Sequence, residues 1–173
     1  PGRTRRLNPR GLSRAGSAPS ETAPFAARRR GRTRRNDNTL MKTIRLKEGK
    51  ERSLQRRHPW VFDSAIARGG ADPGETVRLE SHSGAFLAWA AFSPSSRIRA
   101  RVWSFDEKQR IDAAFLGVLI DRAVRTRVLF DIRSDGLRLI HGESDGLPGL
   151  IVDRYADTLV AQFTSCGVER WKD

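Results

Sequence analysis

The feature that most constrains the fold is a change of pattern at Met41, the only methionine of the chain. From this residue onward, short apolar runs alternate with Gly, Pro, Asp and Ser turn residues. Such runs are typical of strands in a small β-rich domain. The pattern predicts strands at 44–46, 75–80 and 86–92, and a short helix from residue 51 that ends before Pro59.

Residues 1–40 carry most of the net charge, which is +13 from 33 basic and 20 acidic side chains. They contain 11 Arg and no Lys against Glu21 and Asp37, a net charge of +9. A segment so basic and without apolar periodicity buries too little surface to offset its ordering entropy, so we expect a disordered tail. We favour translated sequence upstream of a true start at Met41. A nucleic-acid-binding arm and a transit peptide are the alternatives.

Cysteine content and hydropathy exclude several classes of protein. The single cysteine excludes a disulfide scaffold and a Cys-rich zinc module. No window holds the roughly 18 uninterrupted apolar residues that a membrane helix needs. We therefore expect a soluble, cytoplasmic protein with no membrane partner and no metal site.

Arginines alternate with apolar residues in the segment 97–102. A strand there would place Arg97, Arg99 and Arg101 on one face and the apolar residues on the other. Three cations on one face repel one another, and the planar guanidinium suits phosphate well. The segment therefore indicates either an RNA-phosphate face or, equally, a solvated face whose arginines pair with acids on neighbouring strands.

A second basic cluster lies beside two aromatic residues, Trp60 and Phe62. Two of its arginines are four residues apart and would share a helical face, while the aromatic rings could stack on unpaired bases. Large aromatics are more often part of a core, so we interpret both rings as structural. The basic residues of this cluster are candidates for RNA contact: Arg52, Arg56, Arg57 and His58.

Four longer runs resemble one family of enzymes. They are LKEGKERSLQRRHPWVF at 46–62, GETV at 74–77, GAFLAWAAFSPSSRIRARVWSFD at 84–106 and RLIHGESDGLPGLIVDRYADTLVAQF at 138–163. With these runs, residues 41–173 resemble the N-terminal part of bacterial PUA-domain-containing, S-adenosylmethionine-dependent rRNA methyltransferases of the 23S rRNA cytosine-C5 type. The chain departs from the family at Asp63 and Ser64, where Ser and Gly are usual, and at Trp89 and Ala90, where Arg and Gly are usual.

The resemblance implies an α+β fold. A PUA-like β-barrel would occupy 41–105 and a small α/β (strand-helix-strand) linking domain 106–173, truncated at its C-terminus, with the Rossmann-like methyltransferase domain absent from this chain. It implies RNA binding, with large-subunit rRNA or its precursor particle as the partner. The RNA-binding residues expected are Arg52, Arg56, Arg57, His58, Arg97, Arg99 and Arg101.

The second segment begins with a well-marked helix. Asp112 is a good N-cap, and Ile111 with Leu116 would form a hydrophobic staple. Arginines near the helix C-terminus suit the helix dipole and need no RNA to explain them. A strand is expected at 137–141. The run ESDGLPG at 143–149 brings two carboxylates near His141, yet its Gly and Pro residues favour a structural turn before a pair of strands.

Residues for methyl transfer are missing from the sequence. Cytosine-C5 methylation needs a thiolate nucleophile and a glycine-rich turn for the cofactor. The only thiol, Cys166, lies where similar proteins commonly carry Ala, and no such turn follows a predicted strand. We expect no catalytic or cofactor-binding residues here, S-adenosyl-L-methionine being implied only for a full-length family member. The alternatives are a freestanding PUA-type RNA-binding protein and a non-enzymatic ribosome-assembly or interaction protein.

Overall fold

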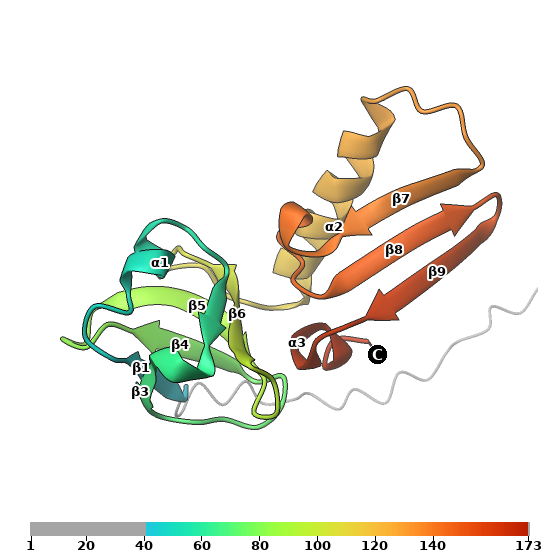
Figure 1. Cartoon of the computed structure of the whole chain (residues 1–173). Coiled ribbons are helices and arrows are strands. Elements are labelled where there is room, and N and C mark those ends of the chain that lie inside the picture. Colours follow the sequence, from blue (N-terminus) through green and yellow to red (C-terminus); the bar gives the residue numbers. More distant parts are fainter. Residues whose placement is uncertain (1–40, 173) are drawn as a thin grey trace, which may run out of the picture. The chain divides into compact units, whose positions relative to one another are not determined.

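A computed structural model describes residues 41–172, which form two sheets and three helices (Figure 1). The first sheet contains six strands, and a one-turn helix, α1 (Arg52–Gln55), follows its first strand. The strands are β1 (Thr43–Leu46), β2 (Trp60–Phe62), β3 (Ile66–Arg68), β4 (Thr76–Glu80), β5 (Phe86–Phe92) and β6 (Ile98–Ser104). The strands expected from the sequence at 44–46, 75–80 and 86–92 are therefore confirmed to within a residue at each end.

The six strands lie in the order β2-β6-β5-β4-β1-β3. All neighbours are antiparallel except β1 and β4, which are parallel. The sheet is a half-barrel with β2 and β3 at the two ends of the strand order, and it fits the α+β fold with a PUA-like domain that the resemblance implies. Strands β2 and β3 are joined by a single turn of 3-10 helix, Asp63–Ala65.

Strict alternation along the strands builds the core of the half-barrel. In β1 and β4 every second residue is buried, including Ile44, Leu46, Val77 and Leu79. Helix α1 adds Leu54 to the same cluster. The period of two thus leaves one face of β1 and of β4 for polar side chains, whereas β5 is buried on both faces from Ala88 to Phe92.

The second sheet has three antiparallel strands in the order β7-β8-β9. Helix α2 (Ala113–Val128) precedes it and lies along one face, and a short helix, α3 (Cys166–Glu169), follows it (Figure 1). The strands are β7 (Gly136–His141), β8 (Leu150–Tyr155) and β9 (Thr158–Phe163). The predicted pair of strands after the turn is confirmed. The expected strand-helix-strand order is wrong, because the described chain has no strand between β6 and α2.

Helix α2 is held in place as its sequence predicts. The Asp112 carboxylate accepts a hydrogen bond from the Phe115 N–H at 3.0 Å, so the N-cap is confirmed. Leu116, Leu119 and Ala123 are buried against the sheet, and Ile111 packs on the same cluster. This second cluster also contains Ala91 of β5 and Trp103 of β6, so the half-barrel and the α2 region share apolar contacts.

Three other expectations concern residues 1–40, long helices and metal ligands. The disordered tail was predicted for residues 1–40, which lie outside the described residues. Within 41–172, no helix is both long and apolar enough to cross a bilayer. The same residues contain no group of three or more His, Cys, Asp or Glu side chains arranged to hold a metal ion.

Candidate nucleic-acid interface

The outer side of strands β2 and β6 carries one of the two predicted basic clusters. We call it the β2–β6 face and define it by Trp60, Phe62, Arg97, Arg99 and Arg101. The predicted alternation is present, because Ala100 and Val102 are buried in the core while Arg99 and Arg101 project from the other side. Arg97 lies one residue before the strand and is exposed.

The three arginines of this face differ in their partners. Arg101 is the most covered, with 16% of its side chain exposed, and its Nε lies 3.6 Å from a Glu143 carboxylate oxygen. Arg99 is 23% exposed and its Nη2 lies 3.8 Å from an Asp63 carboxylate oxygen. Arg97 forms no ion pair with any residue of the part of the chain that the structure describes. Pairing with acids therefore accounts for Arg101 and partly for Arg99, but not for Arg97.

The second cluster lies on and after α1. Arg52 and Arg56 are exposed and stack one helical turn apart, joined by the Arg56 N–H to Arg52 C=O bond of 3.2 Å. Arg57 adopts a left-handed backbone (φ 63°), which ends the helix, and its guanidinium lies 4.8 Å from the centre of the Phe105 ring. The predicted shared face of Arg52 and Arg56 is thus formed, whereas Arg57 is held against an aromatic ring.

His58 and Trp60 are packed together at the start of β2. The His58 Nδ1 accepts a hydrogen bond from the Trp60 N–H at 3.2 Å, and the two rings meet edge to face with centres 5.7 Å apart. The Trp60 indole N–H also donates to Glu143 at 2.7 Å, which ties β2 to the turn after β7. The interpretation of Trp60 as structural is consistent with these contacts.

Phe62 does not fit the structural interpretation. Its side chain is 45% exposed, whereas its neighbour Val61 is 3% exposed and lies in the core. The alternation of β2 places the two residues on opposite faces, so a core role for Phe62 is wrong. Sequence reasoning missed this because a WVF run of three apolar residues gives no signal for which face is buried.

Arg78, on strand β4, is a basic residue whose guanidinium makes structural contacts. Its guanidinium lies over the Phe86 and Trp89 rings, 4.7 and 5.8 Å from their centres. Burial opposes its charge, but hydrogen bonds to Glu107 and Glu80 raise the pKa of Arg78 above its usual value. Trp89, one of the departures from the family pattern, is almost buried and donates its indole N–H to the Glu107 carbonyl at 3.1 Å.

The two carboxylates of the ESDGLPG run are fully engaged in structural contacts. Asp145 receives two hydrogen bonds from Arg127, at 2.9 and 2.6 Å, and one from the His141 N–H. Burial disfavours the Asp145 charge, but the hydrogen bonds from Arg127 and from the His141 backbone hold the pKa of Asp145 below its usual range. Glu143 accepts the Trp60 bond described above. The predicted turn before the pair of strands is therefore confirmed, and both carboxylates contribute contacts to it.

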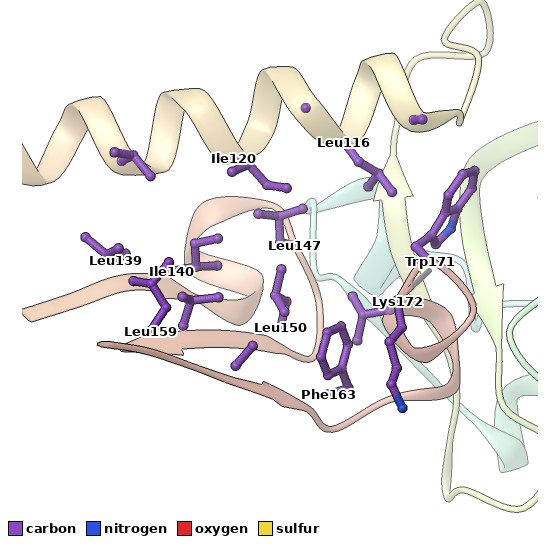
Figure 2. Close-up of a pocket in the computed structure, with 16 residues that line it drawn as sticks. Leu116, Ile120, Leu139, Ile140, Leu147, Leu150, Leu159, Phe163, Trp171 and Lys172 are labelled. Carbon is purple, nitrogen blue, oxygen red and sulfur yellow. The ribbon is translucent and has the colours of Figure 1, made fainter. Parts of the chain in front are cut away.

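A groove with an apolar lining lies between α2 and the three-stranded sheet (Figure 2). It has a volume of about 460 Å³, and its side chains come from α2, β7, β8, β9 and the segment after α3. Lys172 is its only charged lining residue, and Cys166, the sole thiol, is not among those residues. The groove therefore has the chemistry of an uncovered core rather than of a polar ligand site.

Comparison with known proteins identifies the half-barrel. Residues 44–105 match the family model described as "PUA-like domain". Two relatives called "Ribosomal RNA large subunit methyltransferase I" are similar to it. That of Shewanella denitrificans is 48% identical over 136 residues, which are 75% of this chain and 34% of that protein. That of Cronobacter sakazakii is 51% identical over 129 residues, which are 72% and 32% respectively.

The chain thus spans about a third of the length of these curated relatives and matches their N-terminal part. A solved structure, "A putative sam-dependent methyltransferase from Streptococcus mutans", has the same arrangement of elements, with a TM-score of 0.67 and 19% sequence identity. That match covers 76% of this chain and 35% of the solved chain. At this identity the likeness concerns the fold.

Proposed function

We propose that residues 41–105 are the RNA-recognition domain, and residues 106–173 the linking domain, of an S-adenosylmethionine-dependent rRNA methyltransferase. Its substrate is cytosine C5 in large-subunit rRNA or in the precursor particle, and it acts in the cytoplasm. The seven predicted residues, on α1 and on the β2–β6 face, form the RNA contact.

One observation carries this proposal. Three exposed arginines of the predicted sites, Arg52, Arg56 and Arg97, have no carboxylate partner in the described chain and lie within residues 44–105, which match the PUA-like family model. That domain belongs to a chain about half identical to relatives named for methylation of large-subunit rRNA. Arg52 and Arg56 lie one helical turn, about 5.4 Å, apart. Two exposed guanidiniums on one side of a helix can each bind a phosphate of an RNA backbone.

S-adenosylmethionine does not fit the described residues. An adenosyl cofactor needs a glycine-rich strand-to-helix turn and an acidic residue for its ribose hydroxyls. The apolar groove beside α2 offers neither, since Lys172 is its only charged lining residue. We therefore assign recognition of RNA, and no step of methyl transfer, to residues 41–172.

The experiment is a binding titration of the full chain against an RNA hairpin with an unpaired loop and against a DNA duplex of equal length. Each titration is repeated over a series of salt concentrations. We expect the RNA to bind more tightly, with an affinity that falls steeply with salt because phosphate contacts release counterions.

Two other outcomes favour other functions. Equal affinity for both polyanions would mean attraction by charge alone and would contradict RNA recognition. Absence of measurable binding to either would favour an interaction protein whose arginines are only solvated.

A further inference from the structure

We propose that Phe62 is a base-stacking residue, which takes an unpaired base of the RNA while Arg97 and Arg99 hold the flanking phosphates. This inference rests on the RNA-binding function proposed above. It specifies that the RNA bound at this end of the half-barrel is single-stranded.

The exposure of Phe62 is the first observation. Phe62 is 45% exposed, whereas the buried aromatic residues of β5 and β6, Trp89, Phe92 and Trp103, are 9%, 6% and 5% exposed. The alternation of β2 sets Phe62 opposite the buried Val61, so the ring stands on the outer face of the sheet. An open aromatic ring on a sheet face is the stacking platform that single-strand-binding proteins use.

A break in strand register brings a cation beside this ring. Strand β2 pairs with β6 as Trp60 with Arg101 and Val61 with Ala100, but Phe62 then pairs with Ile98. Arg99 is therefore an extra residue in β6, as in a β-bulge, and bulges re-aim side chains next to binding sites. The Asp63 N–H donates to the Arg97 carbonyl at 3.0 Å, which fixes Arg97 beside the same end of β2.

The exposed fraction of the side chains along β6 shows which end of the β2–β6 face is accessible to solvent. Trp103 is 5% exposed within the second core cluster, and exposure rises to 16% at the Arg101 side chain and 23% at the Arg99 side chain. Glu143 stands at the covered end, where it binds Trp60. At the open end, Asp63 faces Arg99 at 3.8 Å and Arg97 has no carboxylate partner among residues 41–172, so the charge near Phe62 is positive.

This combination of groups suits single-stranded RNA better than any other occupant. A protein partner would need a contiguous apolar patch, but charged side chains surround Phe62: Asp63, Arg97 and Arg99. A duplex keeps its bases stacked inside and cannot offer one to the ring. An unpaired nucleotide provides both a flat base for the ring and phosphates for the guanidiniums.

The test compares the full chain with its Phe62→Ala and Phe62→Trp variants. The probe is a short fluorescein-labelled oligouridylate, in which an abasic nucleotide is moved through successive positions. Stacking predicts that Phe62→Ala weakens binding about 5- to 150-fold, that Phe62→Trp retains affinity, and that the salt slope is unchanged. At one position the abasic nucleotide should weaken binding to the wild type but not to Phe62→Ala.

A matched control separates stacking from a general loss of apolar surface. Phe130 is 64% exposed in the segment after α2, so Phe130→Ala should bind like the wild type. Wild-type affinity in Phe62→Ala, or additive losses at every abasic position, would overturn the stacking role and leave RNA binding intact. If the wild type binds neither the oligonucleotide nor the RNA hairpin, the proposed function itself is overturned.

Discussion

The arginines of the predicted sites on the half-barrel differ in their carboxylate partners from two arginines of the α2 region. In the α2 region, Arg127 and Arg138 each form two hydrogen bonds with one buried aspartate, Asp145 and Asp153 respectively. On the half-barrel, Arg52, Arg56 and Arg97 are exposed and have no carboxylate partner in the described chain. An arginine is therefore informative about nucleic acid only when the carboxylate that would neutralise it is missing, and that information lies in the fold.

The largest effect is expected from the Asp145→Ala substitution. It leaves the Arg127 guanidinium, 16% exposed, without its partner in a nearly buried site. Breaking such a pair costs about 3 kcal/mol of unfolding free energy. Thermal denaturation should show a large drop in Tm. The control is Asp131→Asn, since Asp131 is 86% exposed and 3.9 Å from Arg133 and Asn tolerates its left-handed backbone, so this variant should melt like the wild type. Equal melting of both variants would remove the distinction between the regions.

Acid should weaken the α2 region through the same pair. The pKa of Asp145 is lowered below its usual 3.8, because hydrogen bonds from Arg127 and the His141 backbone outweigh the opposing effect of burial. A depressed pKa gives stability that is present above the usual value and is lost as pH falls through the folded value. The Tm difference between wild type and Asp145→Asn should thus be constant above pH about 5 and shrink below about 4. A difference independent of pH would contradict this account.

A smaller loss is expected at the start of α2. Asp112→Ala removes the hydrogen bond to the Phe115 N–H and should lower the free energy of unfolding by about 1 kcal/mol. Denaturant titration measures this change, and Asp112→Asn should recover most of it because the amide oxygen still accepts. RNA affinity should remain at the wild-type level in both variants, since neither alters the half-barrel.

On the half-barrel, Arg97→Gln should leave stability unchanged and weaken RNA binding several-fold. Loss of one phosphate contact lowers the slope of log affinity against log salt by about 0.7 for a single strand. The salt series used for the wild type measures this slope. Arg133→Gln, a 90% exposed arginine of the other region, should keep the wild-type slope. The same decrease in both variants would mean that the charges act without a defined site.

The smallest effect is expected at Glu143, where the two regions meet. Glu143→Gln keeps an acceptor for the Trp60 indole and removes the negative charge 3.6 Å from Arg101. Arg101 then contributes to the RNA contact without a competing carboxylate, so RNA affinity should rise a few-fold and the salt slope should steepen. A fall in affinity would show that Glu143 itself contributes to recognition.

The strands of the half-barrel were predictable because their periodicity is unambiguous. Ile44, Leu46, Val77 and Leu79 alternate with polar residues, and such a period-two pattern has one solution for the buried face. The cap at Asp112 was predictable for a similar reason, since capping is local in sequence. The order of the strands was not, because β1 pairs with β4 and β2 with β6, which lie far apart in the sequence.

The site was predicted only in part, because ion pairs between residues far apart in the sequence decide which of the basic residues remain unpaired. Sequence indicates seven basic residues as equivalent, but Glu143, 42 residues along the chain, approaches Arg101 and leaves Arg97 alone. Phe62 was assigned to the core with Trp60, although the strand separates its ring from Val61. Residue type gave the chemistry of the site, and tertiary contacts decide which residues are free to perform it.

The most direct test of the central claim compares two triple variants of the full chain. One replaces Arg52, Arg56 and Arg97 with Gln, and the other replaces Arg125, Arg133 and Arg154, which are exposed arginines of the α2 region. Both remove the same charge and keep residues 1–40 unchanged. If the half-barrel recognises RNA, the first variant binds the RNA hairpin more weakly, and its affinity depends less steeply on salt concentration. The second variant then binds like the wild type. Equal losses in the two variants would contradict the assignment of RNA recognition to the half-barrel.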